Sequence, residues 1–191
     1  YATPLGSIAQ QFLPVGFSGK SLRVESIKAS PFTATKLPPL TSEQQAALSI
    51  IEKPDTYLLH GDTGSGKTRI YIELALRTLH AGRAAIILTP EIGLTSQLAQ
   101  SFAAVFGTQV VILHSQLTPA EHQRVWLRVL TADAPLVVIG PRSALFSPLK
   151  NIGLIVVDES HEGAYKQEQA PYYHASRVAA QLARLTDSIL V

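Results

Sequence analysis

The chain has 191 residues, of which 46% are hydrophobic, and it carries a formal net charge of +2. This length and composition suit one α/β domain with a packed core and argue against a disordered chain, while so small a charge says nothing about nucleic acid. The chain has no cysteine, which excludes disulfides and cysteine-ligated zinc within these residues. No apolar run approaches the ~20 residues that span a bilayer, and no signal peptide opens the chain. We therefore expect a cytoplasmic protein without a membrane association.

Residues 1–40 are expected to be irregular, because their prolines and glycines forbid a long helix. Leu22–Ile27 alternates weakly and could form a short strand. The chain lacks methionine, and its last residues, Ser188–Val191, form an apolar run with no turn after it. We interpret the chain as a piece of a longer protein, in which residues 1–40 connect a preceding domain to a domain over residues 41–191.

From Thr41 onward the sequence alternates between helical and strand patterns. Thr41 is a candidate N-cap, and Ala47, Leu48 and Ile51 follow it at helical spacing. Strands are expected at Tyr57–His60, Ala84–Thr89, Gln109–Leu113, Leu136–Ile139, Leu154–Asp158 and Ile189–Val191. Helices are expected at Lys67–Leu79, Thr95–Phe106, Pro119–Leu130 and from about Tyr173 to Leu185.

The expected strands are continuous runs of Ile, Val and Leu, as in Leu154–Val157. Such runs indicate burial on both faces, as in a parallel sheet that is covered by helices on each side. The sequence therefore predicts a doubly wound, three-layer α/β/α domain with a mainly parallel sheet, preceded by an irregular N-terminal segment.

A glycine-rich segment, Gly61–Thr68, fits the pattern G-x-x-x-x-G-K-[ST] at every fixed position. It follows an apolar run and precedes a helical pattern, which is the context that a phosphate-binding loop needs. Its backbone N–H groups would form a nest for phosphate oxygens, and the helix dipole would add positive potential. Lys67 would reach the β- and γ-phosphates, and the Thr68 hydroxyl would ligate Mg²⁺. We therefore predict a nucleoside triphosphate site instead of an ordinary loop, with the other phosphate contacts at Gly61, Thr63, Gly64, Ser65 and Gly66.

Two adjacent carboxylates, Asp158 and Glu159, follow the apolar run Leu154–Val157. Ligands of open α/β sheets bind at the carboxyl ends of the strands. Hydrolysis of a triphosphate needs a metal at the phosphates and a group that orients and deprotonates the attacking water. Asp158 suits the metal, and Glu159 suits the water. We expect this pair and Lys67 to meet over one metal–triphosphate at the same edge of the sheet.

The segment Asp158-Glu159-Ser160-His161 is a D-E-x-H box, so the chain resembles the first RecA-like lobe of a superfamily 2 helicase. Further segments narrow the resemblance to the primosomal protein N′ (PriA) family of bacterial replication-restart helicases. In that family's order and spacing they are Thr89–Thr95, Leu113–Ser115, Ile139-Gly140, Arg142–Phe146, Tyr165–Gln167 and Tyr173–Ala175. The opening, with Pro4-Leu5-Gly6 and Leu13-Pro14, resembles the tail of that family's N-terminal DNA-binding domain.

The resemblance implies a P-loop, RecA-like motor lobe of a 3′→5′ DNA helicase that uses ATP and Mg²⁺ and acts on stalled forks and single-stranded DNA. It implies partners among primosome and replicative-helicase-loading proteins, and zinc only in a part of the protein outside these residues. It assigns Gln44 to the adenine edge, with Gln45 as the alternative, and it assigns His161 to sensing the γ-phosphate and coupling to a second lobe. That lobe would supply an arginine finger, worth about 10³–10⁵ in rate. These residues alone are therefore expected to bind ATP weakly, to hydrolyse it poorly and not to unwind DNA.

Two loops at the ends of expected strands would form the DNA face in this resemblance. Without reading sequence, phosphates could be held by Thr89, Pro90, Gly93, Thr95, Arg142 and Ser143. An aromatic and basic stretch after the D-E-x-H box suits stacking on unpaired bases, with candidates Tyr165, Lys166, Tyr172 and Tyr173. For any one of these tyrosines, packing of a loop onto the domain is an equal alternative.

Three other functions remain open at this point. The chain could belong to another P-loop enzyme such as a nucleoside kinase or transporter ATPase, although the adjacent carboxylates and the segments Pro90–Thr95 and Arg142–Phe146 disfavour this. It could belong to another superfamily 2 DNA translocase. It could also be a nucleotide-dependent recruitment module without turnover, against which the intact Glu159 argues for the parent protein.

Overall fold

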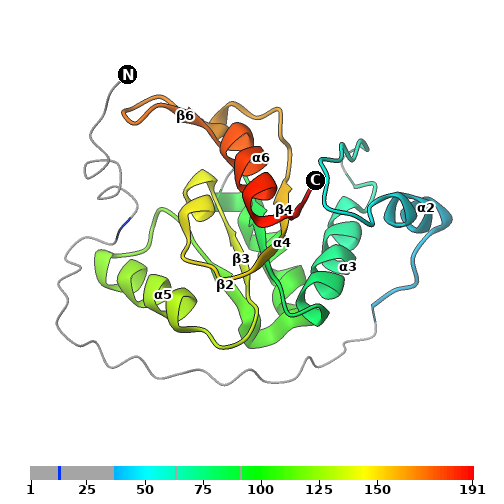
Figure 1. Ribbon diagram of the computed structural model, residues 1–191, viewed down its shortest axis with the longest axis horizontal. Coiled ribbons are helices and arrows are strands. Elements are labelled where there is room, and N and C mark those ends of the chain that lie inside the picture. Colours follow the sequence, from blue (N-terminus) through cyan, green and yellow to red (C-terminus); the bar gives the residue numbers. More distant parts are fainter. Residues whose placement is uncertain (1–12, 14–36, 63, 91) are drawn as a thin grey trace.

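The computed structural model describes residues 13, 37–62, 64–90 and 92–191, and parallel strands form its centre (Figure 1). In chain order, the strands of this main sheet are β1 (Ala84–Leu88), β2 (Val110–Ile112), β3 (Val137–Gly140), β4 (Ile152–Val157) and β7 (Ile189–Leu190). They lie side by side in the order β2-β3-β1-β4-β7, and every neighbouring pair is parallel. The predicted parallel sheet is confirmed.

Helices connect and cover these strands. In the described part of the chain the α-helices are α2 (Ser42–Ile50), α3 (Lys67–His80), α4 (Ile92–Phe106), α5 (Pro119–Thr131) and α6 (Ala175–Thr186). The first of them begins where the sequence pattern predicts, because Thr41 caps α2 through its side chain. None of these helices combines the length and the apolar character needed to cross a bilayer.

Two separate clusters of buried side chains lie on the two faces of the sheet. Ala85 and Ile87 of β1 belong to a cluster with α2, α3 and α4. Their neighbours Ile86 and Leu88 belong to a second cluster with α5 and α6. Since side chains alternate along a strand, one five-residue strand contributes to both cores. The predicted three-layer α/β/α architecture is therefore confirmed.

The strand predicted at Tyr57–His60 is wrong. Thr56 forms only an isolated parallel bridge with Leu190, and the N–H of Tyr57 donates to the carbonyl of Leu190 at 2.8 Å. Leu58, which the apolar pattern suggested would be buried, is 87% exposed.

Several boundaries also differ from the prediction. The helix α4 begins at Ile92, so part of the segment expected to be a loop forms its first turn. The pair Tyr173-His174 forms strand β6, antiparallel to β5 (Lys166–Gln167), and does not begin α6. Short 3₁₀ helices occupy Gly107–Gln109 (η1), Arg142–Phe146 (η2) and Gly163–Tyr165 (η3). The weak strand predicted at Leu22–Ile27 lies outside the described residues.

Candidate functional site

The glycine-rich loop turns tightly between the end of the apolar segment and the start of α3. Gly66 is the N-cap of α3, and both Gly64 and Gly66 have φ angles near 85°, in the left-handed region that favours glycine. A Cβ on Gly61 would lie 2.7 Å from the hydroxyl oxygen of Ser65, so this backbone also lies close to its own loop. The predicted contact Thr63 lies outside the described residues. The backbone has the compact form and the helix N-terminus that a phosphate nest requires.

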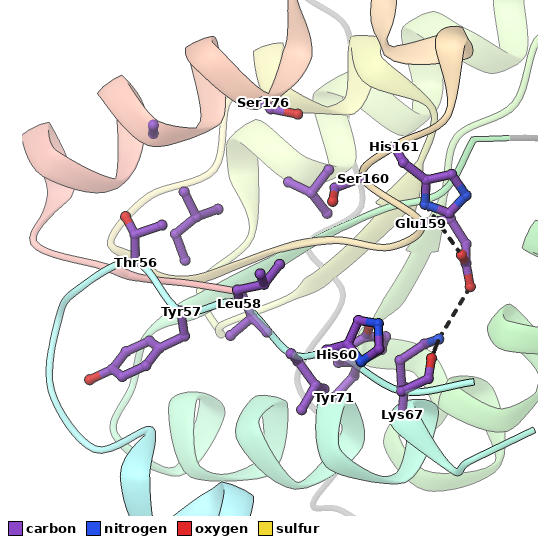
Figure 2. A pocket seen from close by; sticks show the side chains of 16 residues that line it. Thr56, Tyr57, Leu58, His60, Lys67, Tyr71, Glu159, Ser160, His161 and Ser176 are labelled. Atoms are coloured by element: carbon purple, nitrogen blue, oxygen red, sulfur yellow. Dashed lines mark hydrogen bonds and ion pairs between the residues drawn. The ribbon is translucent and has the colours of Figure 1, made fainter. Parts of the chain in front are cut away.

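Lys67 and Glu159 meet across the carboxyl edge of the sheet. The ammonium Nζ of Lys67 lies 3.4 Å from Oε1 of Glu159 and donates a hydrogen bond of 2.7 Å to the carbonyl of Gly61. Figure 2 shows the two side chains directed toward each other. The prediction that the glycine-rich loop and the acidic pair come together at one edge is confirmed by this contact.

Asp158 lies one residue beyond β4 and is held at three points. Its N–H donates to the carbonyl of Leu88 at 3.0 Å, and its own carbonyl accepts from the Tyr165 hydroxyl at 2.6 Å. Its carboxylate oxygen Oδ1 accepts from the Tyr71 hydroxyl at 3.1 Å. Burial raises the pKa of the Asp158 carboxyl above its ordinary value, and the hydrogen bond from Tyr71 opposes part of that rise. The carboxylate is therefore both partly desolvated and fixed in direction.

Glu159 takes a backbone conformation that is uncommon for a residue with a side chain. Its φ is 48°, in the left-handed region, which costs on the order of 1–3 kcal/mol for a residue other than glycine. The N–H of Glu162 donates to the Glu159 carbonyl at 2.9 Å and closes the turn. This turn places the Glu159 carboxylate between Lys67 and His161, whose Nδ1 lies 3.8 Å from Oε2 of Glu159. His161 itself is largely exposed, and its coupling to a second lobe stays a prediction.

A cavity of about 490 Å³ lies beside this cluster. Its lining includes Lys67, Tyr71, Glu159 and His161 (Figure 2). The volume is in the range of small-molecule sites. Charged and hydroxyl groups that come from α3 and from the end of β4 therefore line one hollow.

Gln44 is buried against the glycine-rich loop. Its Nε2 donates to the carbonyl of Gly66 at 3.4 Å, and its Oε1 accepts from the N–H of Thr41 at 3.1 Å. The N–H of Gln44 donates to the Thr41 hydroxyl at 3.2 Å, which completes a capping box. The amide therefore joins α2 to the loop, and its contact with an adenine edge stays a prediction. The alternative, Gln45, is exposed.

The structure contradicts two of the predicted DNA contacts. Thr89 is only 1% exposed, and its N–H donates to the carbonyl of Gly140 at 2.9 Å, so it has no surface for a phosphate. Tyr165 is 0% exposed and its hydroxyl is bonded to Asp158, so it packs in the core and cannot stack on a base. The strand and loop patterns did not reveal that these side chains turn inward.

Six of the other predicted DNA contacts are exposed or partly exposed: Pro90, Arg142, Ser143, Lys166, Tyr172 and Tyr173. Arg142 donates to Gln167 Oε1 at 2.8 Å and to the carbonyl of Ala164 at 2.6 Å, so it joins η2 to the chain that leads into β5. The ring of Tyr173 meets Phe146 edge-on at 5.4 Å. The side chains of Ser143, Lys166 and Tyr172 are exposed. Pro90 is partly buried, and Gly93 and Thr95 lie in the first turn of α4.

Tyr71 belongs to the site although no sequence motif includes it. Tyr71 lies one helical turn after Lys67 on α3, which places both residues on one side of the helix. This spacing is the signal that could have identified it. The partner, Asp158, lies 87 residues away in sequence.

The donor groups present fit Mg²⁺ better than a metal that needs a cage of protein ligands. Among the described residues, no group of three or more His, Cys, Asp or Glu could hold a metal ion. Mg²⁺ typically uses one or two carboxylates together with substrate phosphates and water. Asp158 offers a fixed carboxylate, and Thr68 offers a hydroxyl at the first turn of α3.

Comparisons with known proteins give one consistent family. The family model described as DEAD/DEAH box helicase matches residues 41–188. Replication restart protein PriA of Bacillus subtilis (strain 168) is 44% identical over 158 residues, covering 80% of this chain and 20% of that protein. The protein of the same name from Rickettsia felis (strain ATCC VR-1525 / URRWXCal2) is 39% identical over 180 residues, covering 94% of this chain and 27% of that protein. The chain thus spans roughly a fifth to a quarter of the length of these relatives.

Solved structures show the same fold at low identity. The Hef helicase domain of Pyrococcus furiosus superposes with a TM-score of 0.57 at 22% identity, covering 78% of this chain and 31% of that one. The UvsW helicase from Bacteriophage T4 gives a TM-score of 0.53 at 18% identity, covering 83% of this chain and 54% of that one. The predicted RecA-like fold is confirmed.

Proposed function

The chain belongs to the DEAD/DEAH box helicase family, and we propose that it is the ATP-binding motor lobe of a 3′→5′ DNA helicase that acts in replication restart. The observation that carries the proposal is the meeting of Lys67 with the D-E-x-H box, at 3.4 Å between Nζ and Oε1 of Glu159. The similarity to replication restart proteins supports the cellular role. Partners would be forked and single-stranded DNA, primosome proteins and replicative-helicase loaders. Since bacterial chromosomes lie in the cytoplasm, the protein would act there.

Each residue of the cluster has a proposed role in ATP hydrolysis. Lys67 would exchange its contacts with Gly61 and Glu159 for oxygens of the β- and γ-phosphates. Glu159, released from Lys67, would orient and deprotonate the attacking water. Thr68 and Asp158 would hold Mg²⁺, which when bound neutralises charge on the phosphates. Gln44 would contact the adenine edge, and His161 would report the γ-phosphate to a second lobe.

The DNA face is proposed at the carboxyl edge of the sheet, at the start of α4 and along η2 and the β5–β6 hairpin. The first N–H groups of an α-helix lack intrahelical partners and favour anions, so the first turn of α4 suits phosphates. Exposed Ser143, Lys166 and Tyr172 extend this face. Crosslinking to single-stranded DNA should label residues 90–95, 142–143 and 166–174, and label concentrated on α5 would contradict the proposal.

Nucleotide binding tests the site directly. Titration of a fluorescent ATP analogue in the presence of Mg²⁺ should show binding that Lys67→Ala abolishes, because the phosphates lose their cation. The matched control is Lys150→Ala, which removes an exposed lysine and should keep the affinity of the unaltered protein. Unaltered affinity in Lys67→Ala would refute the phosphate-binding role.

Turnover tests the base in a protein of the relatives' full length. Glu159→Gln should bind MgATP normally and lose DNA-stimulated hydrolysis by about 10²-fold or more, because an amide cannot accept the proton of water. Glu52→Gln, at an exposed position, should hydrolyse ATP at the unaltered rate. Normal turnover in Glu159→Gln would exclude this residue as the base.

A further inference from the structure

We propose that Tyr71 is a positioning residue, which fixes the direction of the Asp158 carboxylate for the metal of a bound metal–nucleotide. This inference rests on the proposed function, because it concerns how this chain's own residues hold Mg²⁺ with ATP. It assigns a role to a side chain that lies outside both sequence motifs.

Tyr71 belongs to α3, the helix that begins at the end of the phosphate loop. Tyr71 lies on α3, one turn beyond Lys67, and is 4% exposed. Its hydroxyl donates to Oδ1 of Asp158 at 3.1 Å. A hydroxyl buried to this degree needs a partner, and a carboxylate is the strongest acceptor that a side chain provides. The phenol therefore links the helix of the phosphate loop directly to the D-E-x-H box.

The backbone of Asp158 is fixed independently of Tyr71. Its N–H donates to Leu88 at 3.0 Å, and its carbonyl accepts from Tyr165 at 2.6 Å. With the backbone held on both sides, rotation of the side chain is the freedom that remains. The Tyr71 hydrogen bond to Oδ1 limits that rotation, and the two oxygens of a carboxylate together offer about four acceptor positions, so the group can still take a ligand. Tyr71 thus sets the direction of the carboxylate, whereas Leu88 and Tyr165 set its location.

A purely structural role for Tyr71 predicts a different result. If the hydroxyl bonded to Asp158 only to meet its own need for a hydrogen-bond partner in the core, its removal would change the stability of the protein. The response of nucleotide binding to metal would then stay unchanged. If it positions Asp158, its removal must weaken the action of Mg²⁺ more than it weakens the binding of nucleotide without metal. The two roles therefore differ in the coupling between metal and nucleotide.

The experiment compares Tyr71→Phe with Tyr57→Phe, each of which removes one phenolic oxygen and keeps the ring. Tyr57 also lines the cavity, but it is a matched control because the oxygen removed donates to the carbonyl of Lys53 at 3.0 Å, and Figure 2 shows its ring directed away from Lys67. Binding of a fluorescent ATP analogue is measured in EDTA and then across a Mg²⁺ series. In Tyr71→Phe the Mg²⁺ concentration for half-maximal effect should rise about tenfold, as expected for loss of a hydrogen bond to a charged group. Its affinity in EDTA, and every value for Tyr57→Phe, should stay within about twofold.

The outcomes separate this inference from the proposed function. An unaltered protein that binds no nucleotide would refute the proposed function itself. Metal-dependent binding in the unaltered protein with an unchanged Mg²⁺ response in Tyr71→Phe would overturn the inference alone. Equal weakening of Tyr71→Phe with and without Mg²⁺ would also overturn it, because that is the result of damage to α3. As a second readout, Tyr71→Phe in an Asp158→Asn background should cause no further shift in the Mg²⁺ response, and additive shifts would count against the inference.

Discussion

At the scale of single residues, the start of α3 depends on a contact between Gly66 and Gln44. Gly66 has a φ of 86°, and a Cβ there would lie 2.5 Å from Nε2 of Gln44. Gln44 cannot move away freely, because its amide also bonds to Thr41 and to the Gly66 carbonyl. The glycine of the phosphate loop is therefore required for two physical reasons, its backbone angle and the space that Gln44 occupies.

Alanine substitutions at two glycines of the loop separate these two reasons. Gly64 has a φ of 85° but has nothing within 4 Å of an added Cβ. Gly64→Ala should therefore cost about 1–2 kcal/mol of unfolding free energy from its left-handed backbone alone. Gly66→Ala should cost about 1 kcal/mol more, because the hydrogen bond from Gln44 to Gly66 must break. Urea unfolding of both variants measures the difference.

The background Gln44→Ala provides the control for this comparison. Without the Gln44 amide, Gly64→Ala and Gly66→Ala should lower the free energy of unfolding by equal amounts, since only the cost of the left-handed backbone angle remains. Equal costs in the unaltered background would show that the Gln44 contact has no energetic weight at the loop.

At the scale of elements, α5 begins with a complete cap. The Thr118 hydroxyl accepts from the N–H of Glu121 at 3.3 Å, and the Glu121 carboxylate accepts from the N–H of Thr118 at 2.8 Å. Pro119 occupies the first helical position, as the sequence predicted. Because α5 has a single fully buried residue, Val129, its start depends on local hydrogen bonds more than on burial.

Removal of this cap should destabilise the protein by a measurable amount. Thr118→Ala should lower the free energy of unfolding by about 1 kcal/mol, because the N–H of Glu121 in the first turn loses its acceptor and the Glu121 carboxylate loses the hydroxyl donor. The matched control is Thr131→Ala at the other end of α5, where the hydroxyl only bonds back to the carbonyl of Leu127. That substitution should have little effect. A Thr118→Ala variant as stable as Thr131→Ala would contradict the role of the cap.

The same cap makes stability depend on pH in a defined direction. Hydrogen bonds from the backbone and side chain of Thr118 lower the pKa of Glu121 from its ordinary value of 4.5. A lowered pKa in the folded state adds stability that is present above the unfolded value and is lost as the pH falls through the folded value. Glu121→Gln should therefore remove part of the loss of stability below about pH 4.5, measured by urea unfolding across acid pH.

At the scale of the whole molecule, the sheet lies between two clusters of buried side chains, to both of which its strands contribute. One core contains Phe102, which is fully buried and stacks on Phe106 with ring centroids 5.5 Å apart. The other core contains Tyr165, which also touches the site through Asp158. The layer that carries Tyr165 therefore links the packing of the domain to the position of Asp158.

Removal of a buried apolar side chain should lower the free energy of unfolding far more than removal of an exposed one. Phe102→Ala should lower the free energy of unfolding by about 3–5 kcal/mol, because it removes a buried ring and leaves a cavity. Leu185→Ala, at a position that is 75% exposed, should change it by less than about 0.5 kcal/mol. Denaturant unfolding monitored by circular dichroism checks both values. Similar costs at the two positions would mean that the core around Phe102 is not packed as described.

The parts of the site that the sequence predicted are those encoded by short, continuous sequence motifs. Gly61–Thr68 and Asp158-Glu159 are short patterns, and their placement at the ends of apolar runs was enough to bring them to one edge of a parallel sheet. The prediction of Tyr57–His60 as a strand was wrong, because an apolar run does not by itself specify strand pairing, and here only Thr56 forms a bridge, to Leu190. The expected base stacking by Tyr165 was wrong because an aromatic residue suits a core as well as a nucleic acid.

Local patterns of glycines, caps and apolar runs therefore specified the α/β/α layers, the phosphate loop and the acidic pair, since each of these is encoded by residues that are close in the chain. Packing between distant segments determined three other features of the site. These are the hydrogen bond from Tyr71 to Asp158, the burial of Thr89, and the hydrogen bond from Gln44 to the Gly66 carbonyl. These contacts join residues that are separated by tens of positions in sequence. They depend on how the helices pack against the sheet, and the hydrophobic pattern of a single segment does not specify that packing.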